Sequence, residues 1–309
     1  MNLIYDQRME TRLLEYFVTV ADELNVTRAS ERLFVAQSTV SAGLRSLERE
    51  LGVALFERTT KTVRLLPPGE ALLPVARGLL DDLEGLRQVA TESGAGLRGR
   101  VRIGTFASLQ VFDLPAALGA FRRRHPLVDL QLQASPSGST GLAEELSHGR
   151  LDLAFSALPT LPGLQSWPLA SREFVALLPA EHPLAGRART GGRVALAELA
   201  GDDWVDVLPG FGNRVQLDRA LTERGIVRHI SAEVAELPSV AQCVAAGLGV
   251  AVVPDLRPFG DGRGVVAGCV TVGLSDPLPP WVVSLAARSG AGNRPQIMAL
   301  VEELRAAAV

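Results

Sequence analysis

Apolar residues recur at three- and four-residue spacing in three short segments near the start of the chain. The segments carry Leu13, Leu14, Phe17 and Val20; then Ala29, Leu33 and Phe34; and then Val40, Leu44, Leu47 and Leu51. Each segment has one apolar face, so the pattern predicts three helices around one small core. Asn25 and Thr27 are placed to cap the second helix, and Gly52 is placed to end the third because glycine tolerates a positive φ.

After Gly52 the pattern changes to short β-branched runs around a polar turn at residues 59–61, which predicts a hairpin. Three helices followed by a hairpin predict a winged helix-turn-helix. From residue 68 to about residue 93, apolar residues then recur at heptad-like spacing, at Leu72, Ala76, Leu79, Leu83, Leu86 and Ala90. We expect a long linker helix that pairs with another copy of itself, with a kink or a delayed start at Pro74.

A glycine-rich hinge at residues 94–99 separates these elements from alternating strand-like and helical runs. The strand-like runs are VRIGTF, VDLQLQ, LDLAFSA, FVALLP, WVDVL, GVAVVP and WVVSLAA, and the helical ones are 114–124, 140–148, 214–224, 237–247 and 293–307. This alternation predicts an α/β domain with mostly parallel sheets and two lobes. The expected domains are 9–66, 67–93 and 100–309, with lobe I at about 100–165 and 268–309 and lobe II at about 166–267.

Composition narrows the function classes. The formal net charge of −3 gives no global basic signal, so nucleic-acid binding requires a local patch. The start of the chain lacks the apolar core of a signal peptide, and no stretch of about 18 apolar residues occurs, so we expect a cytoplasmic protein without a membrane span. Cys243 and Cys269 have no metal-ligand spacing, and the four histidines have no catalytic order, so we expect no metal, no cofactor and no enzyme.

Short polar side chains crowd the start of the third predicted helix. Gln37, Ser38, Thr39 and Ser41 stand there, Arg45 follows one turn later, and Arg58, Lys61 and Arg64 cluster in the hairpin. A helix start of this kind lets its N–H groups approach phosphates while glutamine, serine and threonine contact base edges. A basic wing would hold phosphates. The alternative is a well-capped surface helix with no ligand.

The residues of this region carry a specific resemblance. Residues 13–70 resemble the DNA-binding domain of LysR-type transcriptional regulators, with matching residues in register at Phe17, Ala21, Ala29, Leu33, Gln37, Ser38, Val40, Ser41, Leu47, Glu48, Gly52, Leu55, Phe56, Arg58 and Gly69. The rest is similar to the same family's effector-binding domain in VRIGTF, HPLVDLQLQ, LAEELSHGRLDLAF and VAAGLGVAVVP. The resemblance implies a C-terminal domain like a type 2 periplasmic binding protein, with two lobes around a cleft.

The chain departs from the family pattern at four positions. Ala42 and Gly43 replace larger, often basic or amide residues, which removes contacts from the third helix. Leu66 and Pro68 replace the usual threonine and alanine, so the linker helix loses a hydroxyl cap. We therefore expect a leaner recognition helix that relies on the wing and on dimerisation for affinity.

Residues that follow the predicted strands, all of them polar except Phe211, mark a candidate effector site between the lobes. They are Thr105 and Ser108 after the first strand, Ser137, Ser139 and Thr140 after the second, and Phe211 and Asn213 after WVDVL. Hydroxyls beside helix N-termini favour a small anionic effector. The alternative is that each of these residues only forms a turn or a cap.

The resemblance implies several partners: double-stranded DNA with an imperfect inverted repeat, a small-molecule effector, a second copy of the chain in a dimer or tetramer, and RNA polymerase. The main rival is a cytosolic α/β solute-binding or enzymatic protein whose N-terminal helices serve only dimerisation. A solute receptor outside the membrane would need an export signal. A redox sensor would use Cys243 and Cys269, but both stand in apolar runs that favour burial.

Overall fold

The computed structural model describes residues 10–58, 63–91, 96–106, 111–255, 267–290 and 294–308. Lys61 and Ser108 lie outside these ranges, and the side chains of Arg58 and of residues 87–91 are also outside the description. The chain divides into two compact units, residues 1–95 and 96–309. Each unit has its own hydrophobic core.

The first unit contains the predicted three helices, hairpin and long helix. Its elements are α1 (Thr11–Glu23), α2 (Val26–Arg32), α3 (Gln37–Leu51), β1 (Phe56–Arg58), β2 (Val63–Leu65) and α4 (Pro67–Thr91). Apolar residues from three of these helices meet in one core where Phe17, Val20, Val40, Leu44 and Leu47 are fully buried. The winged helix-turn-helix is therefore confirmed, and its core is the one that the three- and four-residue spacing predicts.

Local signals end the short helices of this unit. The side-chain oxygen of Asn25 accepts hydrogen bonds from the N–H groups of Thr27 (2.9 Å) and Arg28 (3.1 Å), so Asn25 caps α2. Thr27 lies inside the helix, and the expectation that it also acts as a cap is wrong. Gly52 ends α3 with φ of 70°, as predicted.

Helix α4 begins at Pro67 and continues through Pro74, so its start is not delayed. Its first turns pack on the core of the same unit, where Ala76 is fully buried, and Arg77 forms an ion pair with Asp22 of α1. The expectation that the whole apolar stripe faces another copy is therefore wrong for Ala76. Leu79 and Leu86 remain 51% and 68% exposed and leave the later turns open for a partner.

The second unit contains most of the sheet structure. Its elements are β3 (Gly99–Thr105), α5 (Leu114–Arg124), β4 (Val128–Ala134), α6 (Gly138–Ser147), β5 (Leu153–Ser156), β6 (Leu164–Arg172), β7 (Phe174–Pro179), α7 (Arg187–Thr190), β8 (Arg193–Val194), the 3-10 helix η1 (Leu196–Leu199), β9 (Asp203–Val207), α8 (Gly212–Glu223), β10 (His229–Val234), α9 (Leu237–Ala245), β11 (Ala251–Pro254), β12 (Cys269–Leu274), β13 (Trp281–Arg288) and α10 (Pro295–Ala307).

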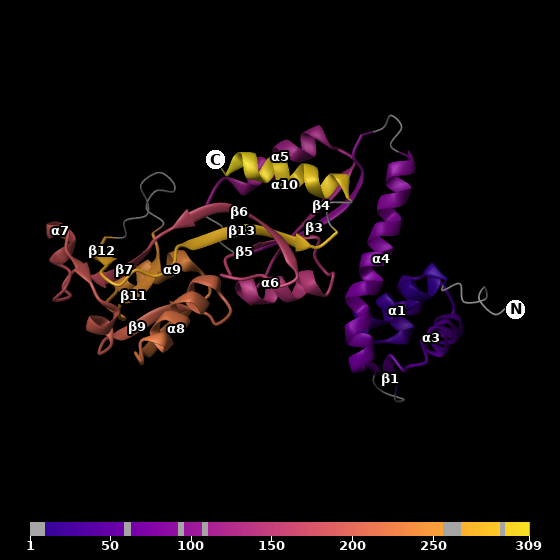
Figure 1. The fold of residues 1–309 in the computed structure, drawn as a ribbon, viewed down its shortest axis with the longest axis horizontal. Helices are drawn as coiled ribbons and strands as arrows, with labels where there is room; N and C mark the ends of the chain where they lie inside the picture. The colour runs from indigo at the N-terminus through magenta and orange to yellow at the C-terminus, as the bar shows by residue number, and fades with distance from the viewer. Residues whose placement is uncertain are drawn as a thin grey trace, which may run out of the picture. The chain divides into compact units, whose positions relative to one another are not determined.

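These elements form two lobes, each with a central sheet. The lobe I sheet has the strand order β4-β3-β5-β13-β6, with α5 and α10 on one face and α6 on the other (Figure 1). The lobe II sheet has the order β11-β7-β12-β8, and a bridge between Trp204 and Val250 joins the β10-β9 pair to it. Successive residues of β7 face opposite sides of this sheet. Val175 packs in the hydrophobic cluster that contains Val240 of α9, whereas Ala176 packs in the cluster that contains Leu217 of α8. Each lobe is thus a sheet covered by helices on both faces.

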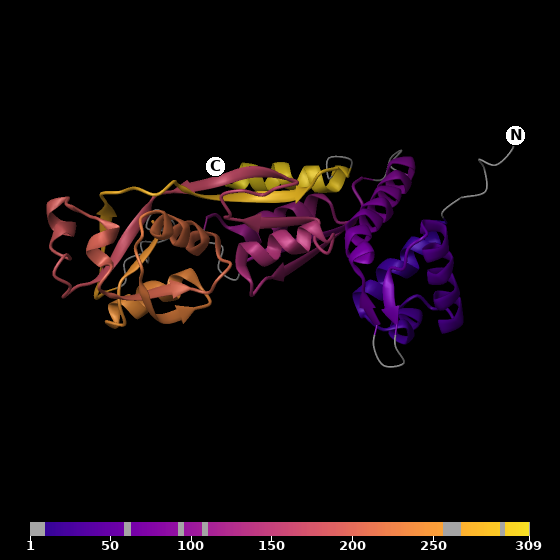
Figure 2. The ribbon, with the colours of Figure 1, turned by 60° about the horizontal axis from the view of Figure 1, so that its bottom comes forward.

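Strand directions and lobe boundaries differ from expectation. β3 runs parallel to β4 and β5, but β13 runs antiparallel to β5 and β6, and β7 runs antiparallel to β11 and β12, so the sheets are mixed. The reason is that the chain crosses between the lobes twice, along β6 into β7 and back through β13 (Figure 2). The pairing of β6 assigns residues 164–172 to lobe I, and that of β12 assigns residues 269–274 to lobe II.

Buried ion pairs fix the helices of both lobes. In lobe I the Asp152 carboxylate, 1% exposed, accepts hydrogen bonds from Arg102 (2.9 Å) and from Arg294 at the start of α10 (2.6 Å). Burial raises the pKa of Asp152, but the hydrogen bonds and charges of these arginines outweigh it and hold the pKa below the ordinary value of an aspartate. In lobe II the Arg228 guanidinium lies 2.7 Å from Asp206 of β9 and also pairs with Asp218 of α8, which fixes α8 on its sheet.

Candidate functional site

The two faces of α3 differ sharply. Val40, Leu44 and Leu47 are fully buried on one face. The predicted contact residues lie on the other, where Gln37, Ser38, Thr39 and Arg45 are exposed and Ser41 is half-buried. The N-cap residue that precedes the helix is Ala36, which supplies no side-chain cap. The helix is therefore not capped by a side chain at its N-cap position, and α3 presents its first N–H groups there.

Gly43 has a packing function on the buried face. A Cβ at Gly43 would lie 2.5 Å from Cδ2 of Tyr16, whose side chain is only 4% exposed. A larger side chain there would displace the tyrosine and separate α3 from α1. Of the two small residues Ala42 and Gly43, only Ala42 is exposed. The expectation that Gly43 removes a contact from the outer face is therefore wrong.

The hairpin is anchored to α3 by one carboxylate. Oε1 of Glu48 accepts hydrogen bonds from the N–H groups of Leu55 (3.0 Å) and Phe56 (3.2 Å). β1 and β2 pair antiparallel with Arg58 opposite Val63, and Arg64 on β2 is exposed. Lys61 of the predicted basic wing lies outside the described residues. Glu48 therefore sets the position of the wing relative to α3.

In the second unit, the lobes meet through the backbone at three glycines, Gly138, Gly210 and Gly212, which we call the glycine seam. The N–H of Thr140 in lobe I donates to the carbonyl of Gly210 in lobe II (3.0 Å). A Cβ at Gly138 would lie 2.8 Å from Cδ2 of Phe211, and one at Gly212 would collide with the carbonyl of Ala157. Only glycine permits this approach, which brings the N-termini of α6 and α8 to the same place.

The predicted effector residues lie around this seam in different roles. The Thr105 hydroxyl donates to the carbonyl of Phe106 (3.2 Å), and the Ser139 hydroxyl accepts from the N–H of Ala157 (3.0 Å), so both serve local structure. Ser137 is exposed at the start of α6. Asn213 is 4% exposed, and its buried Nδ2 has no hydrogen-bond partner. Ser108 lies outside the described residues.

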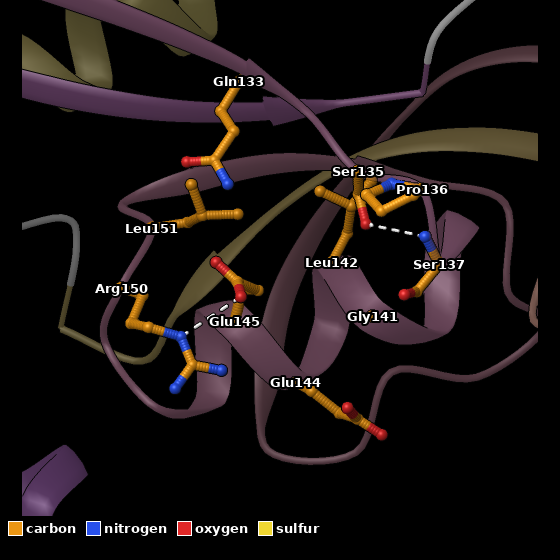
Figure 3. Close-up of a pocket in the computed structure, with 10 residues that line it drawn as sticks. All are labelled: Gln133, Ser135, Pro136, Ser137, Gly141, Leu142, Glu144, Glu145, Arg150 and Leu151. Carbon is orange, nitrogen blue, oxygen red and sulfur yellow. Dashed lines mark hydrogen bonds and ion pairs between the residues drawn. The ribbon is translucent and has the colours of Figure 1, made fainter. Parts of the chain in front are cut away.

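A separate hollow of about 190 Å³ lies between β4 and α6 of lobe I (Figure 3). Its lining combines apolar side chains such as Leu142 and Leu151 with two polar pairs: the N–H of Ser137 donates to the Ser135 hydroxyl (3.2 Å), and Arg150 pairs with Glu145 (3.1 Å). Glu144 adds a second carboxylate to the lining. Two carboxylates against one guanidinium make this hollow less suited to an anion than the seam.

A metal site requires clustered ligands, and a reactive thiol requires a lowered pKa. No group of three or more histidine, cysteine, aspartate or glutamate side chains among them is arranged to hold a metal ion. Cys243 and Cys269 are free and half-buried, and burial raises the pKa of the Cys269 thiol. None of the helices in the described ranges combines the length and apolarity of a membrane span.

The family follows from comparison with known proteins. Residues 11–70 match the family described as bacterial regulatory helix-turn-helix protein, lysR family, and residues 94–309 match the LysR substrate binding domain. Together the two matches cover nearly all of the chain. The chain is a LysR-type transcriptional regulator. The regulator interpretation is thereby confirmed over the enzymatic alternative.

Curated relatives of this LysR-type regulator match along most of their length. A probable hydrogen peroxide-inducible genes activator from Streptomyces viridosporus is 33% identical over 302 residues, which cover 95% of this chain and 93% of that protein. The regulator CysB from Burkholderia cenocepacia is 32% identical over 289 residues, 92% of this chain and 89% of that protein. These relatives are transcriptional regulators that share both domains.

Solved structures of LysR-type regulators share the fold. A full-length OxyR variant from Pseudomonas aeruginosa is 28% identical with a TM-score of 0.71, covering 98% of this chain and 95% of that one. Full-length BenM is 25% identical with a TM-score of 0.52, covering 96% and 97%. The predicted architecture, a winged helix-turn-helix with a linker helix and a two-lobed domain, is therefore confirmed.

Sequence reasoning missed the residues that position these sites. In the sequence Glu48 stands out only as part of the LysR-type register, although its carboxylate holds the wing. Gly138, Gly210 and Gly212 were not singled out, although glycines just before predicted helices are the available signal for close backbone approach. The neighbours that require these glycines come from distant parts of the chain, so no local pattern identifies them.

Gly138→Ala tests the seam. The new Cβ would meet Phe211, and Gly138 has φ of 58°, so the substitution should separate the lobes. We expect hydrogen exchange at the Thr140 N–H to accelerate at least ~10-fold, since this group would lose its Gly210 acceptor. Gly163→Ala is the matched control, because Gly163 has φ of 72° but nothing within 4 Å of the added Cβ. Equal exchange rates in the two variants would contradict the seam.

Proposed function

We propose that this LysR-type regulator places α3 in the major groove of a promoter site, with Gln37, Ser38, Thr39, Ser41 and Arg45 facing the bases and their phosphates. Arg58, Lys61 and Arg64 of the wing hold the neighbouring backbone. The observation that carries this proposal is the exposed, polar and uncapped start of α3 in a domain of the LysR helix-turn-helix family. Phosphates bind favourably at such helix starts.

The proposed DNA site is an imperfect inverted repeat in a promoter, read by a dimer acting in the cytoplasm. Leu79 and Leu86 of α4 are exposed and seven residues apart, so they supply an apolar helix face for a second copy. Two copies related by a two-fold axis present two α3 helices to two half-sites. Pairing of dimers into a tetramer and contact with RNA polymerase complete the proposed assembly.

The proposed effector is a small anion bound between the lobes, at Thr105, Ser108, Ser137, Ser139, Thr140, Phe211 and Asn213. The N-termini of α6 and α8 meet there, and each brings the positive end of a helix dipole. The buried Nδ2 of Asn213 is a donor that lacks an acceptor. An unsatisfied buried donor is costly, so a carboxylate that reaches it would gain a strong hydrogen bond.

Regulation follows from competition at the seam. The Gly210 carbonyl already accepts from the Thr140 N–H, so an anion that takes this N–H displaces the carbonyl. The effector therefore binds more tightly to an arrangement of the lobes without the Thr140–Gly210 hydrogen bond than to the arrangement that has it. A ligand with different affinities for two arrangements shifts their populations, and in a dimer this shift changes the spacing of the DNA-binding domains.

A peroxide response is the function that the name of the Streptomyces viridosporus relative suggests. A peroxide-sensing cysteine needs an accessible thiolate with a lowered pKa. Here burial raises the pKa of Cys269, and both cysteines pack against the apolar cluster of lobe II. We therefore propose a bound effector rather than cysteine oxidation as the signal.

Arg45→Ala tests the DNA interface. Loss of one phosphate contact from each copy, two in the dimer, should weaken binding at least ~10-fold and lower the slope of log affinity against log salt by about 2. Fluorescence anisotropy on a labelled duplex from the region upstream of the coding sequence measures both quantities. Arg122→Ala is the control, because Arg122 is also an exposed cation but belongs to the second unit. An unchanged slope in Arg45→Ala, or an equal loss in Arg122→Ala, refutes this interface.

Titration calorimetry tests the effector site with pairs of small carboxylates and their primary amides. We expect a carboxylate to bind at least ~10-fold more tightly than its amide, since only the carboxylate is an anion. Asn213→Asp, which puts a negative charge at the seam, should weaken carboxylate binding by a similar factor. Gln131→Glu adds the same charge at an exposed position on β4 and should have little effect. Tight binding only of cationic or apolar ligands would exclude an anionic effector.

A further inference from the structure

Phe34 has an unusual combination of exposure and backbone conformation. It lies in the turn between α2 and α3, and its side chain is 94% exposed, more than any other large apolar side chain among the described residues. Its φ is 54°, in the left-handed region that bulky side chains rarely adopt. Both features cost folding free energy: the ring stays in water instead of the core, and the backbone is held in a strained conformation. No contact among the described residues offsets either cost.

The turn is held rigidly in this conformation. The N–H of Phe34 donates to the carbonyl of Glu31 (3.1 Å), and the N–H of Val35 donates to that of Ser30 (3.1 Å). The side chain of Val35 packs against the core of the unit. The backbone is therefore fixed on both sides of the ring, which projects from a preorganised support.

Phe34 is close in the chain to the residues of the proposed DNA-binding surface. Phe34 precedes Gln37, the first residue of α3, by less than one helical turn of chain. The cations of α2 are already paired within the unit, because Arg28 and Arg32 both form ion pairs with Glu23. The exposed ring of Phe34 is thus accompanied on α2 by two arginines that are already paired with Glu23.

We propose that Phe34 is a DNA-contact residue whose ring packs against the deoxyribose of the backbone at the edge of the groove that α3 enters. This inference rests on the proposed function, since it takes the α3 surface as the DNA interface. Sugar contacts position a protein on the duplex without reading sequence. Burial of the ring against sugar carbons gains apolar contact area and releases no counterion.

The test compares Phe34→Asn, Phe34→Tyr and Leu24→Asn in the full chain. Asparagine tolerates a positive φ, so Phe34→Asn removes the ring without adding strain. Leu24→Asn is the matched control, because Leu24 also has a positive φ (45°) and is 51% exposed but lies at the end of α1. Circular dichroism checks folding, and Phe34→Gly replaces Phe34→Asn if the latter does not fold.

Binding is measured by fluorescence anisotropy over a salt series, on the upstream duplex and on a duplex of scrambled sequence. We expect Phe34→Asn to weaken binding about fivefold on both duplexes at every salt concentration, with an unchanged salt slope. Phe34→Tyr and Leu24→Asn should stay within about twofold of wild type, since the first keeps the ring and the second leaves the surface intact.

Three results would overturn the inference. Unchanged affinity of Phe34→Asn shows that the ring does not contact DNA, and a loss on the upstream duplex alone shows that it reads a base rather than a sugar. A changed sedimentation profile with normal DNA binding assigns Phe34 to a contact between copies. Failure of the wild type to bind either duplex instead contradicts the proposed function, so the two failures are distinguishable.

Discussion

The hydrogen bond from the Thr140 N–H to the Gly210 carbonyl, 3.0 Å long, is the contact on which the regulatory unit depends. It joins the two lobes beside the crossing strands and a shared hydrophobic cluster, and it depends on Gly138, Gly210 and Gly212, which leave no Cβ between the backbones. The same approach brings two helix N-termini together. A single geometric constraint therefore produces both the lobe contact and the positive potential that favours an anion.

The DNA-binding unit shows the same dependence on close approach. Gly43 lets α3 lie against Tyr16, and Glu48 fixes the wing through two backbone N–H groups. Arg77 and Asp22 join α4 to α1, so the linker helix and the helix-turn-helix form one packed body. A rotation of α4 in a dimer would carry α3 with it, which is the physical requirement for coupling the linker to the DNA.

Periodicity predicted the helices well because burial in a helix repeats every three to four residues, as Val40, Leu44 and Leu47 show. Sequence analysis missed four strands, β6, β8, β10 and β12. Two of them show why: β6 mixes polar and apolar residues around Pro168, and no residue of β10 is fully buried, so neither has a clear apolar pattern. The lobe boundaries were displaced for this reason. The candidate sites were found only where polar residues follow apolar runs, as at Gln37 and Thr140.

Contacts between distant segments could not be predicted from one sequence. Nothing near Gly43 indicates Tyr16, and nothing near Asn213 indicates that its amide is buried without an acceptor. Ala76 belongs to the heptad stripe of the linker helix, yet it is buried within its own unit. A pattern specifies which face is apolar, whereas the partner of that face depends on the tertiary fold.

The central claim is that two copies of this chain place two α3 helices on one DNA site. Hydroxyl-radical footprinting of the region upstream of the coding sequence tests this claim most directly. The account predicts two protected half-sites in inverted orientation, with their centres separated by about 10 base pairs or a multiple of that distance. A single unsymmetrical footprint, or no protection at concentrations where the chain is dimeric, would contradict it.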